Sequence, residues 1–138
     1  DLATLRRETD VPIAADESVA TNRDAREAVA ARACDYATVK LAKVGGISAA
    51  LEIAAELPVY LSSALEGPVG IAAAAHVVQA LPSPSAGTGL AHGLATERLF
   101  SETCGSGAEL RGPELHLGEG PGIGVELDWA AIERRRLR

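Results

Sequence analysis

The sequence lacks methionine altogether, and its 138 residues include only two cysteines and 3% aromatic residues. Since position 1 is not methionine, we expect a truncated or processed chain. The longest apolar run, Val69 to Val78, is far shorter than the roughly 20 residues that cross a membrane, so no membrane segment is expected. Cys34 and Cys104 have no metal-binding or redox spacing, and no signal peptide is expected. These features predict a cytoplasmic protein.

Basic residues are also scarce, since the chain has 13 basic and 19 acidic residues and a net charge of −6. A nucleic-acid-binding protein needs a basic face, so nucleic acid is not an expected partner. The one basic cluster, Glu133 to Arg138, has the pattern of a solvated helix end. The 47% of hydrophobic residues fit a globular domain and exclude a disordered chain.

Four short apolar runs alternate with segments of helical periodicity. Thr21 or Asn22 is suited to cap one of these helices. Strands that alternate with helices predict an α/β fold with a parallel sheet, either a small open sheet or half of an eight-stranded barrel. The expected strands are Val11–Asp16, Tyr36–Leu41, Pro58–Ser63 and Leu90–Leu94, and the expected helices are 1–9, 23–33, 48–57, 67–81 and a short one after Thr96.

The composition changes near residue 105, where glycine becomes frequent. Residues 105–138 are predicted to form an extended tail with a turn, which packs on something other than the sheet. Residues 1–104 are predicted to hold the α/β part.

Polar residues follow each expected strand, at the edge where parallel sheets place their active sites. Asp16 taken alone is equally well explained as a helix cap or a core salt bridge. Four consecutive strands that all end in polar residues are a stronger signal. These residues are Asp16 and Glu17, Lys40, Ser62 and Ser63, and His92 or Thr96.

Lys40 lies in an apolar strand, where a charge is costly unless it is paired. It is either a lysine at the rim of the sheet or one that faces the ligand edge near Asp16. Arginine cannot exchange its proton, whereas lysine can, and the only two lysines of this chain are Lys40 and Lys43. Lys43 lies three residues after Lys40, an odd spacing that in a strand would point the two side chains to opposite faces. Lys43 is therefore expected to point away from Lys40, toward the turn, and to be structural.

Two further motifs have a weaker meaning. Gly45-Gly46 lacks the rest of a nucleotide-binding motif, so a phosphate site is not expected. Ser62 and Ser63 lack the flanking glycines of a nucleophile elbow, which makes them candidate ligand-binding hydroxyls rather than nucleophiles.

Longer motifs resemble a known family. Pro12–Ser18 together with Val39–Gly46 resembles the enolase superfamily of the muconate-lactonizing type. Leu61–Ile71 and Leu90–Thr96 are most similar to the o-succinylbenzoate synthases, and Pro121–Val125 resembles the segment that returns to their capping domain. The resemblance implies the C-terminal half of a (β/α) barrel, strands five to eight, with an extended tail that would pack on a missing capping domain.

The resemblance also implies roles for individual residues. Asp16 would be a ligand of Mg²⁺, with Glu17 beside it, and Lys40 would stabilise an enediolate as a cation. Ser62, Ser63 and the backbone near Gly93 would contact a small carboxylate substrate. The implied reaction is a magnesium-dependent dehydration in menaquinone biosynthesis, which begins with removal of a proton α to a carboxylate.

Three parts of the family pattern have no counterpart in the chain: the lysine-x-lysine motif, two metal carboxylates and the capping domain. They would precede Asp1, so the chain is expected to be inactive alone and to need the missing N-terminal half of the same enzyme. Two alternatives stay open. One is a dipeptide or N-acylamino acid epimerase that uses Lys40 as an acid/base, and the other is a non-catalytic α/β module that binds a small ligand.

Overall fold

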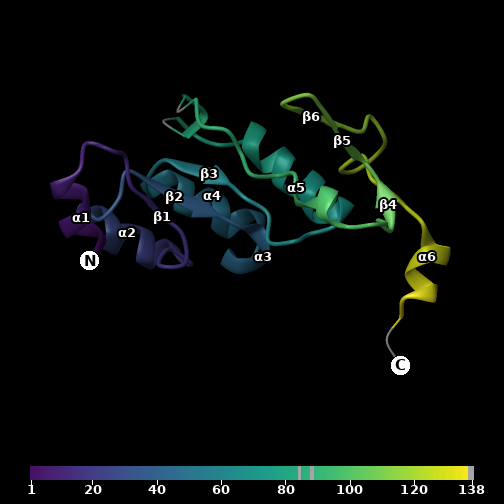
Figure 1. Cartoon of the computed structure of the whole chain (residues 1–138), viewed down its shortest axis with the longest axis horizontal. Helices are drawn as coiled ribbons and strands as arrows, with labels where there is room; N and C mark the ends of the chain where they lie inside the picture. The colour runs from purple at the N-terminus through teal and green to yellow at the C-terminus, as the bar shows by residue number, and fades with distance from the viewer. Residues whose placement is uncertain (84, 88, 137–138) are drawn as a thin grey trace.

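The computed structural model describes residues 1–83, 85–87 and 89–136. Three parallel strands form a sheet in the order β1-β2-β3, and helices alternate with them along the chain (Figure 1). The predicted α/β fold with a parallel sheet is therefore confirmed. The elements are α1 (Leu2–Glu8), β1 (Ala14–Ala15), α2 (Asn22–Ala30), β2 (Tyr36–Val39), α3 (Leu41–Val44), α4 (Ile47–Glu56), β3 (Val59–Leu61) and α5 (Pro68–Gln79).

The sheet has one apolar face and one polar face. Residues of alternate parity in β2 and β3 pack against α4 and α5, where Ile53 and Ile71 are almost fully buried. Burial of each such side chain contributes about 1.5–3 kcal/mol. The fully buried strand residues on this face are Ala37, Val39, Val59 and Leu61.

The second strand is shorter than predicted. It ends at Val39, and Lys40 is already the N-cap of helix α3. Gly45 ends α3 at a φ of 95°, a left-handed conformation that glycine adopts without strain, and Gly46 starts α4 at a φ of 111°. The Gly45-Gly46 pair thus joins two helices.

The predicted fourth strand is reduced to one bridge, in which Ser62 pairs with Gly93 in parallel. If Leu90–Leu94 continued as a strand beside β3, the backbone N–H of Leu61 would donate to a backbone carbonyl oxygen of that strand. Instead, Nδ1 of His92 accepts that hydrogen bond at 3.0 Å. The imidazole therefore ends the ladder at this point, and the rest of Leu90–Leu94 is not a strand.

Asp35 fixes the opposite end of the sheet. Its Oδ1 accepts from Nη2 of Arg6 in α1 at 2.6 Å, and its Oδ2 accepts from the backbone N–H of Ile13 at 2.8 Å. The hydrogen bond from Arg6 is the main reason why the pKa of Asp35 is lowered. These bonds hold α1 against the beginnings of β1 and β2.

The last third of the described chain is built from small antiparallel pairs. β5 pairs with β6 as a hairpin, and both contact α5 (Figure 1). Part of the predicted tail therefore packs on the helix layer of the sheet. The elements are η1 (Ser85–Gly87), η2 (Thr96–Leu99), β4 (Gly105–Ser106), β5 (Ala108–Arg111), β6 (Glu114–Leu117), β7 (Glu126–Leu127) and α6 (Trp129–Arg134).

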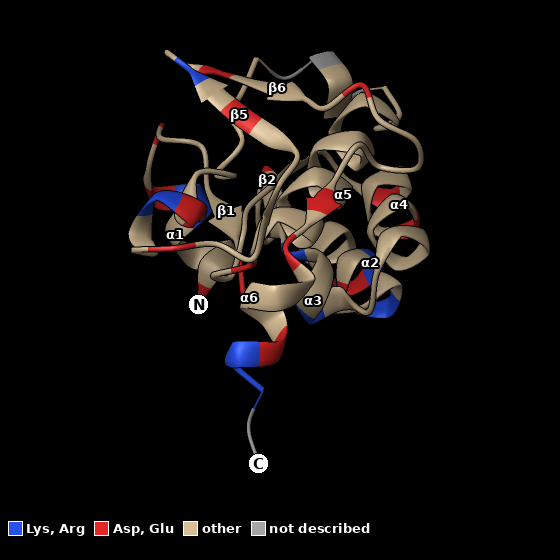
Figure 2. Cartoon of the chain, turned by 90° about the vertical axis from the view of Figure 1, so that its right-hand side faces the viewer, with Lys and Arg blue, Asp and Glu red and all other residues tan. Residues whose placement is uncertain are grey.

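Helix α6 projects from the rest of the molecule, and its last turn contains both acidic and basic residues (Figure 2). Trp129 at its start is 71% exposed. The division into residues 1–104 and 105–138 stays a prediction. Among the described helices, none is both long and apolar enough to span a membrane.

Candidate functional site

The predicted site residues lie at the carboxyl ends of neighbouring strands. Asp16 directly follows β1, Lys40 follows β2, and Ser62 follows β3 and pairs with Gly93. Because parallel strands end at the same edge of a sheet, residues far apart in the sequence meet there. The structure thus places Asp16, Lys40, Ser62 and Gly93 along one edge of the sheet.

Asp16 and Lys40 form the centre of this edge. Nζ of Lys40 donates a hydrogen bond to the Asp16 carboxylate, and the two charges form an ion pair. The Lys40 side chain is only 14% exposed, whereas that of Asp16 is 38% exposed. Lys40 is therefore a sheltered cation that faces Asp16, as one of the two interpretations predicted, and its catalytic role stays a prediction.

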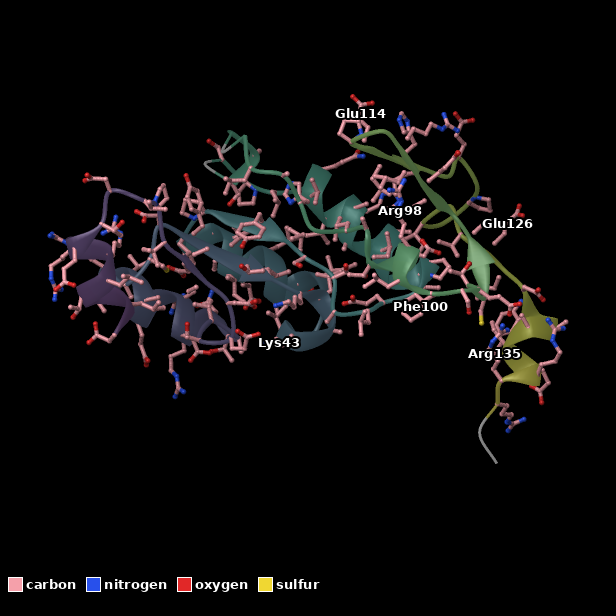
Figure 3. The ribbon with its side chains drawn as sticks, viewed as in Figure 1. Lys43, Arg98, Phe100, Glu114, Glu126 and Arg135 are labelled. Atoms are coloured by element: carbon pink, nitrogen blue, oxygen red, sulfur yellow. The ribbon has the colours of Figure 1, made fainter. Side chains whose placement is uncertain are left out.

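Glu17 extends the ion pair outward. Its carboxylate lies 3.1 Å from Nζ of Lys43 and 3.8 Å from Nζ of Lys40. The hydrogen bond from Lys43 is the main reason why the pKa of Glu17 is lowered. The expectation that Lys43 points away is wrong, because strand parity does not apply on helix α3, where Figure 3 shows Lys43.

Ser62 and Gly93 are in close contact at the same edge. A Cβ atom at position 93 would lie 3.0 Å from the Ser62 hydroxyl oxygen, so any larger residue there would crowd this hydroxyl. Ser63 differs from Ser62 because it is buried. Its hydroxyl lies 2.9 Å from the carbonyl oxygen of Gly93 and 2.7 Å from the hydroxyl of Thr96, which fixes the returning segment. Substrate contact by Ser62, Ser63 and Gly93 stays a prediction.

Two further residues lie on the polar face of the sheet and were not among the predicted site residues. Thr38 and Tyr60 are paired across β2 and β3, and their hydroxyls share a hydrogen bond of 2.7 Å. They lie two positions before Lys40 and Ser62, which places all four on one face. The sequence signal for them is their spacing: each lies two positions before Lys40 or Ser62, and residues two positions apart in a strand share a face.

His92 belongs to the other face, although the sequence placed it among the strand-end residues. Its neighbour Gly93 pairs with Ser62 on the polar face, so His92 lies on the side that packs against α5. Burial lowers its pKa, which keeps the imidazole neutral and lets Nδ1 accept the N–H of Leu61. His92 is therefore a structural group.

Replacing His92 with alanine should lower the free energy of unfolding by about 1–3 kcal/mol, because the buried N–H of Leu61 loses its acceptor. Asparagine is the matched variant, because its side-chain oxygen can take the place of Nδ1 and should restore most of the loss. Urea denaturation followed by circular dichroism measures both effects. Equal stability of the alanine variant and the parent chain would contradict this role.

The lowered pKa of His92 predicts how the stability of the folded chain depends on pH. The unfolded chain takes up a proton on His92 near its ordinary pKa of 6.5, whereas the folded chain does so only at lower pH. The unfolding free energy should therefore fall as the pH drops below about 6.5, and this fall should be smaller in His92→Asn. Denaturation curves at several pH values between 8 and 5 test the difference.

The described residues do not form a magnesium site by themselves. A carboxylate oxygen is a ligand that Mg²⁺ prefers, and Asp16 offers one at the strand edge. Across residues 1–83, 85–87 and 89–136, however, no group of three or more His, Cys, Asp or Glu side chains is placed to hold a metal. A metal at Asp16 would need further ligands from outside this set.

Comparisons with known proteins agree on one family. A family model described as enolase C-terminal domain-like matches residues 1–131. The o-succinylbenzoate synthase of Mycobacterium tuberculosis is 50% identical over 106 residues, which are 74% of this chain and 31% of that enzyme. Muconate cycloisomerase 1-2 of Acinetobacter lwoffii is 38% identical over 143 residues, which are 97% of this chain and 36% of that enzyme.

A solved structure shows the same fold. The dipeptide epimerase of Cytophaga hutchinsonii, complexed with Mg and the dipeptide D-Ala-L-Val, superposes with a TM-score of 0.84 at 28% identity. The superposition covers 96% of this chain and 37% of the epimerase. The chain thus spans about a third of the length of the proteins it matches.

Proposed function

Since the chain belongs to the enolase C-terminal domain-like family, we propose that it carries part of the active site of an o-succinylbenzoate synthase, a carbon–oxygen lyase. The 50% identity to the Mycobacterium tuberculosis synthase supports this choice within the family. The single observation that carries the proposal is the ion pair between Asp16 and Lys40 at adjacent strand ends. A place in menaquinone biosynthesis and a cytoplasmic location belong to the same proposal.

In this proposal, Lys40 acts as a fixed cation. Removal of a proton α to a carboxylate leaves negative charge on the substrate, and a preorganised ammonium group stabilises that charge. The low exposure of Lys40 strengthens its electrostatic effect because little water screens it. Asp16 holds the ammonium at the strand edge until substrate binds, and the Ser62 hydroxyl beside Gly93 offers a donor to the small carboxylate substrate.

The proposal requires residues from outside the chain. Asp16 would be one of several carboxylate ligands of Mg²⁺, with Glu17 next to it, and the others would come from the N-terminal half of the enzyme. When bound, Mg²⁺ would stabilise negative charge on the substrate carboxylate. The base that removes the proton and a capping domain over the strand edge would come from the same partner.

An epimerase is the second candidate. Its support is the structural match to the dipeptide epimerase of Cytophaga hutchinsonii. In that case Lys40 would deliver or remove a proton on one face of the substrate, and no water would be eliminated. The lower identity of 28%, against 50% for the synthase, favours the synthase.

Two hybrid enzymes separate these candidates. In the synthase hybrid, this chain replaces the matching third of the Mycobacterium tuberculosis synthase. In the epimerase hybrid, it replaces the matching part of the Cytophaga hutchinsonii epimerase. We expect the synthase hybrid to form o-succinylbenzoate and the epimerase hybrid not to epimerise D-Ala-L-Val. The reverse result would favour the epimerase, and folded but inactive hybrids would favour a non-catalytic module.

A further inference from the structure

A pocket of about 480 Å³ lies on the face of the sheet opposite to Lys40. Its walls are α5, the segment 91–95 and the β5–β6 hairpin. His92 and Leu94 line it, and they flank Gly93, which pairs with Ser62 on the polar face. Alternate residues of an extended segment point to opposite faces, so this pocket is separate from the strand-end site.

The pocket exists because a hairpin covers this part of the sheet. The short η2 follows the segment 91–95 directly, and the hairpin formed further along the chain contacts α5. Its volume falls within the roughly 300–1,000 Å³ of small-molecule sites. The walls are mainly aliphatic, with contributions from Val78, Leu94, Leu110, Leu115 and Leu117.

His92 is one of the polar residues that line this mainly apolar pocket, together with Gln79, Glu114 and His116. Its Nδ1 already accepts the N–H of Leu61, so the proton of the neutral ring lies on Nε2. Among the described residues, Nε2 of His92 has no hydrogen-bond partner. The imidazole therefore has one N–H left to donate.

Charge near the pocket disfavours an ionic ligand. Glu114 is 75% exposed and lies 3.5 Å from His116, and Figure 3 shows it at the outer edge of the hairpin. No lysine or arginine lines the pocket within the described residues. An anion would thus find no fixed cation, and a cation would have to leave water for aliphatic walls.

We infer that this pocket binds a small, uncharged and mainly apolar molecule, to which His92 Nε2 donates one hydrogen bond at an acceptor oxygen. The interaction is independent of the chemistry at Lys40, because the two sites lie on opposite faces of the sheet. A second-site ligand of this kind would also stabilise the contact between the hairpin and α5.

Acetophenone and ethylbenzene are matched probes, since they have similar shape and only acetophenone has an acceptor oxygen. Titrations followed by ¹H–¹⁵N NMR should show shifts at Leu94, Leu110 and Leu115. The same titrations on the synthase hybrid provide a second folded sample. Acetophenone should bind about fivefold more tightly than ethylbenzene, which corresponds to one net hydrogen bond.

Four variants locate the binding. His92→Asn keeps an acceptor for Leu61, but its shorter side chain has no donor at the Nε2 position, so it should reduce the preference for acetophenone. Val78→Phe should fill the pocket and abolish binding of both probes, whereas Val69→Phe, at an exposed position on the same helix, should not change it. Leu110→Phe repeats the test from the hairpin side if Val78→Phe lowers the helical signal.

Equal affinity for the two probes would overturn the proposed hydrogen bond. Binding that survives both pocket-filling variants, or shifts centred on Lys40, would overturn the proposed site. The synthase activity of the hybrid does not enter either readout, so failure of the proposed function leaves this test intact.

Discussion

Replacing Lys40 with alanine is expected to lower kcat of the synthase hybrid about 10²–10³-fold, the effect of removing one preorganised group that stabilises developing charge. The side chain is sheltered and paired with Asp16, so water cannot replace it efficiently. Steady-state formation of o-succinylbenzoate measures the loss. Lys43→Ala is the matched control, because the Lys43 side chain pairs with Glu17 at the outer rim, and it should change kcat less than about threefold.

Lys40→Arg distinguishes the two candidate roles of this residue. Arginine keeps the positive charge but cannot exchange a proton at neutral pH. A fixed cation predicts that the arginine variant retains more activity than the alanine variant. Arginine and alanine variants that lose activity equally would contradict the fixed-cation role and favour an acid/base lysine.

Replacing Asp16 with asparagine is expected to raise the Mg²⁺ concentration for half-maximal activity of the synthase hybrid at least about 100-fold. Mutating a group that only supports a metal ligand typically lowers the affinity for the metal about 10–100-fold. Asp16 is proposed as a direct ligand, so its loss should have at least as large an effect. Asparagine keeps the size of the side chain and removes its negative charge. Mg²⁺ titrations of activity measure the change.

Glu17→Gln is the matched control for Asp16→Asn. Glu17 is the next residue, but its side chain is 75% exposed and bonds mainly to Lys43. Its loss should shift the Mg²⁺ dependence much less than the loss of Asp16. Equal shifts in the two variants would contradict the assignment of the direct ligand to Asp16.

The sequence was sufficient to predict the centre of the site. Asp16 and Lys40 each follow a short apolar strand, and successive strands of a parallel α/β sheet end at one edge, so their proximity follows from the strand order. Thr21 was likewise predictable as a helix cap, and it forms a capping box with Asp24. The cap follows from the local sequence pattern, and the proximity of Asp16 and Lys40 follows from the rule that successive parallel strands end at one edge of the sheet.

The remaining features depend on where secondary structure ends. The position of Lys43 is set by α3, a helix of four residues that is too short to produce a periodic pattern. The bond from Leu61 to His92 replaces a ladder hydrogen bond, and nothing in the local sequence marks a side chain that accepts in place of a carbonyl. The docking of the hairpin on α5 is a long-range contact, which composition alone does not determine.

The central claim is that this chain carries one wall of the active site, with Asp16 and Lys40, and needs further groups from a partner to act. The most direct test compares the isolated chain with the synthase hybrid in one assay for Mg²⁺-dependent o-succinylbenzoate formation. We predict turnover by the hybrid and none above background by the isolated chain. Turnover by the isolated chain at a rate similar to that of the hybrid would contradict the claim.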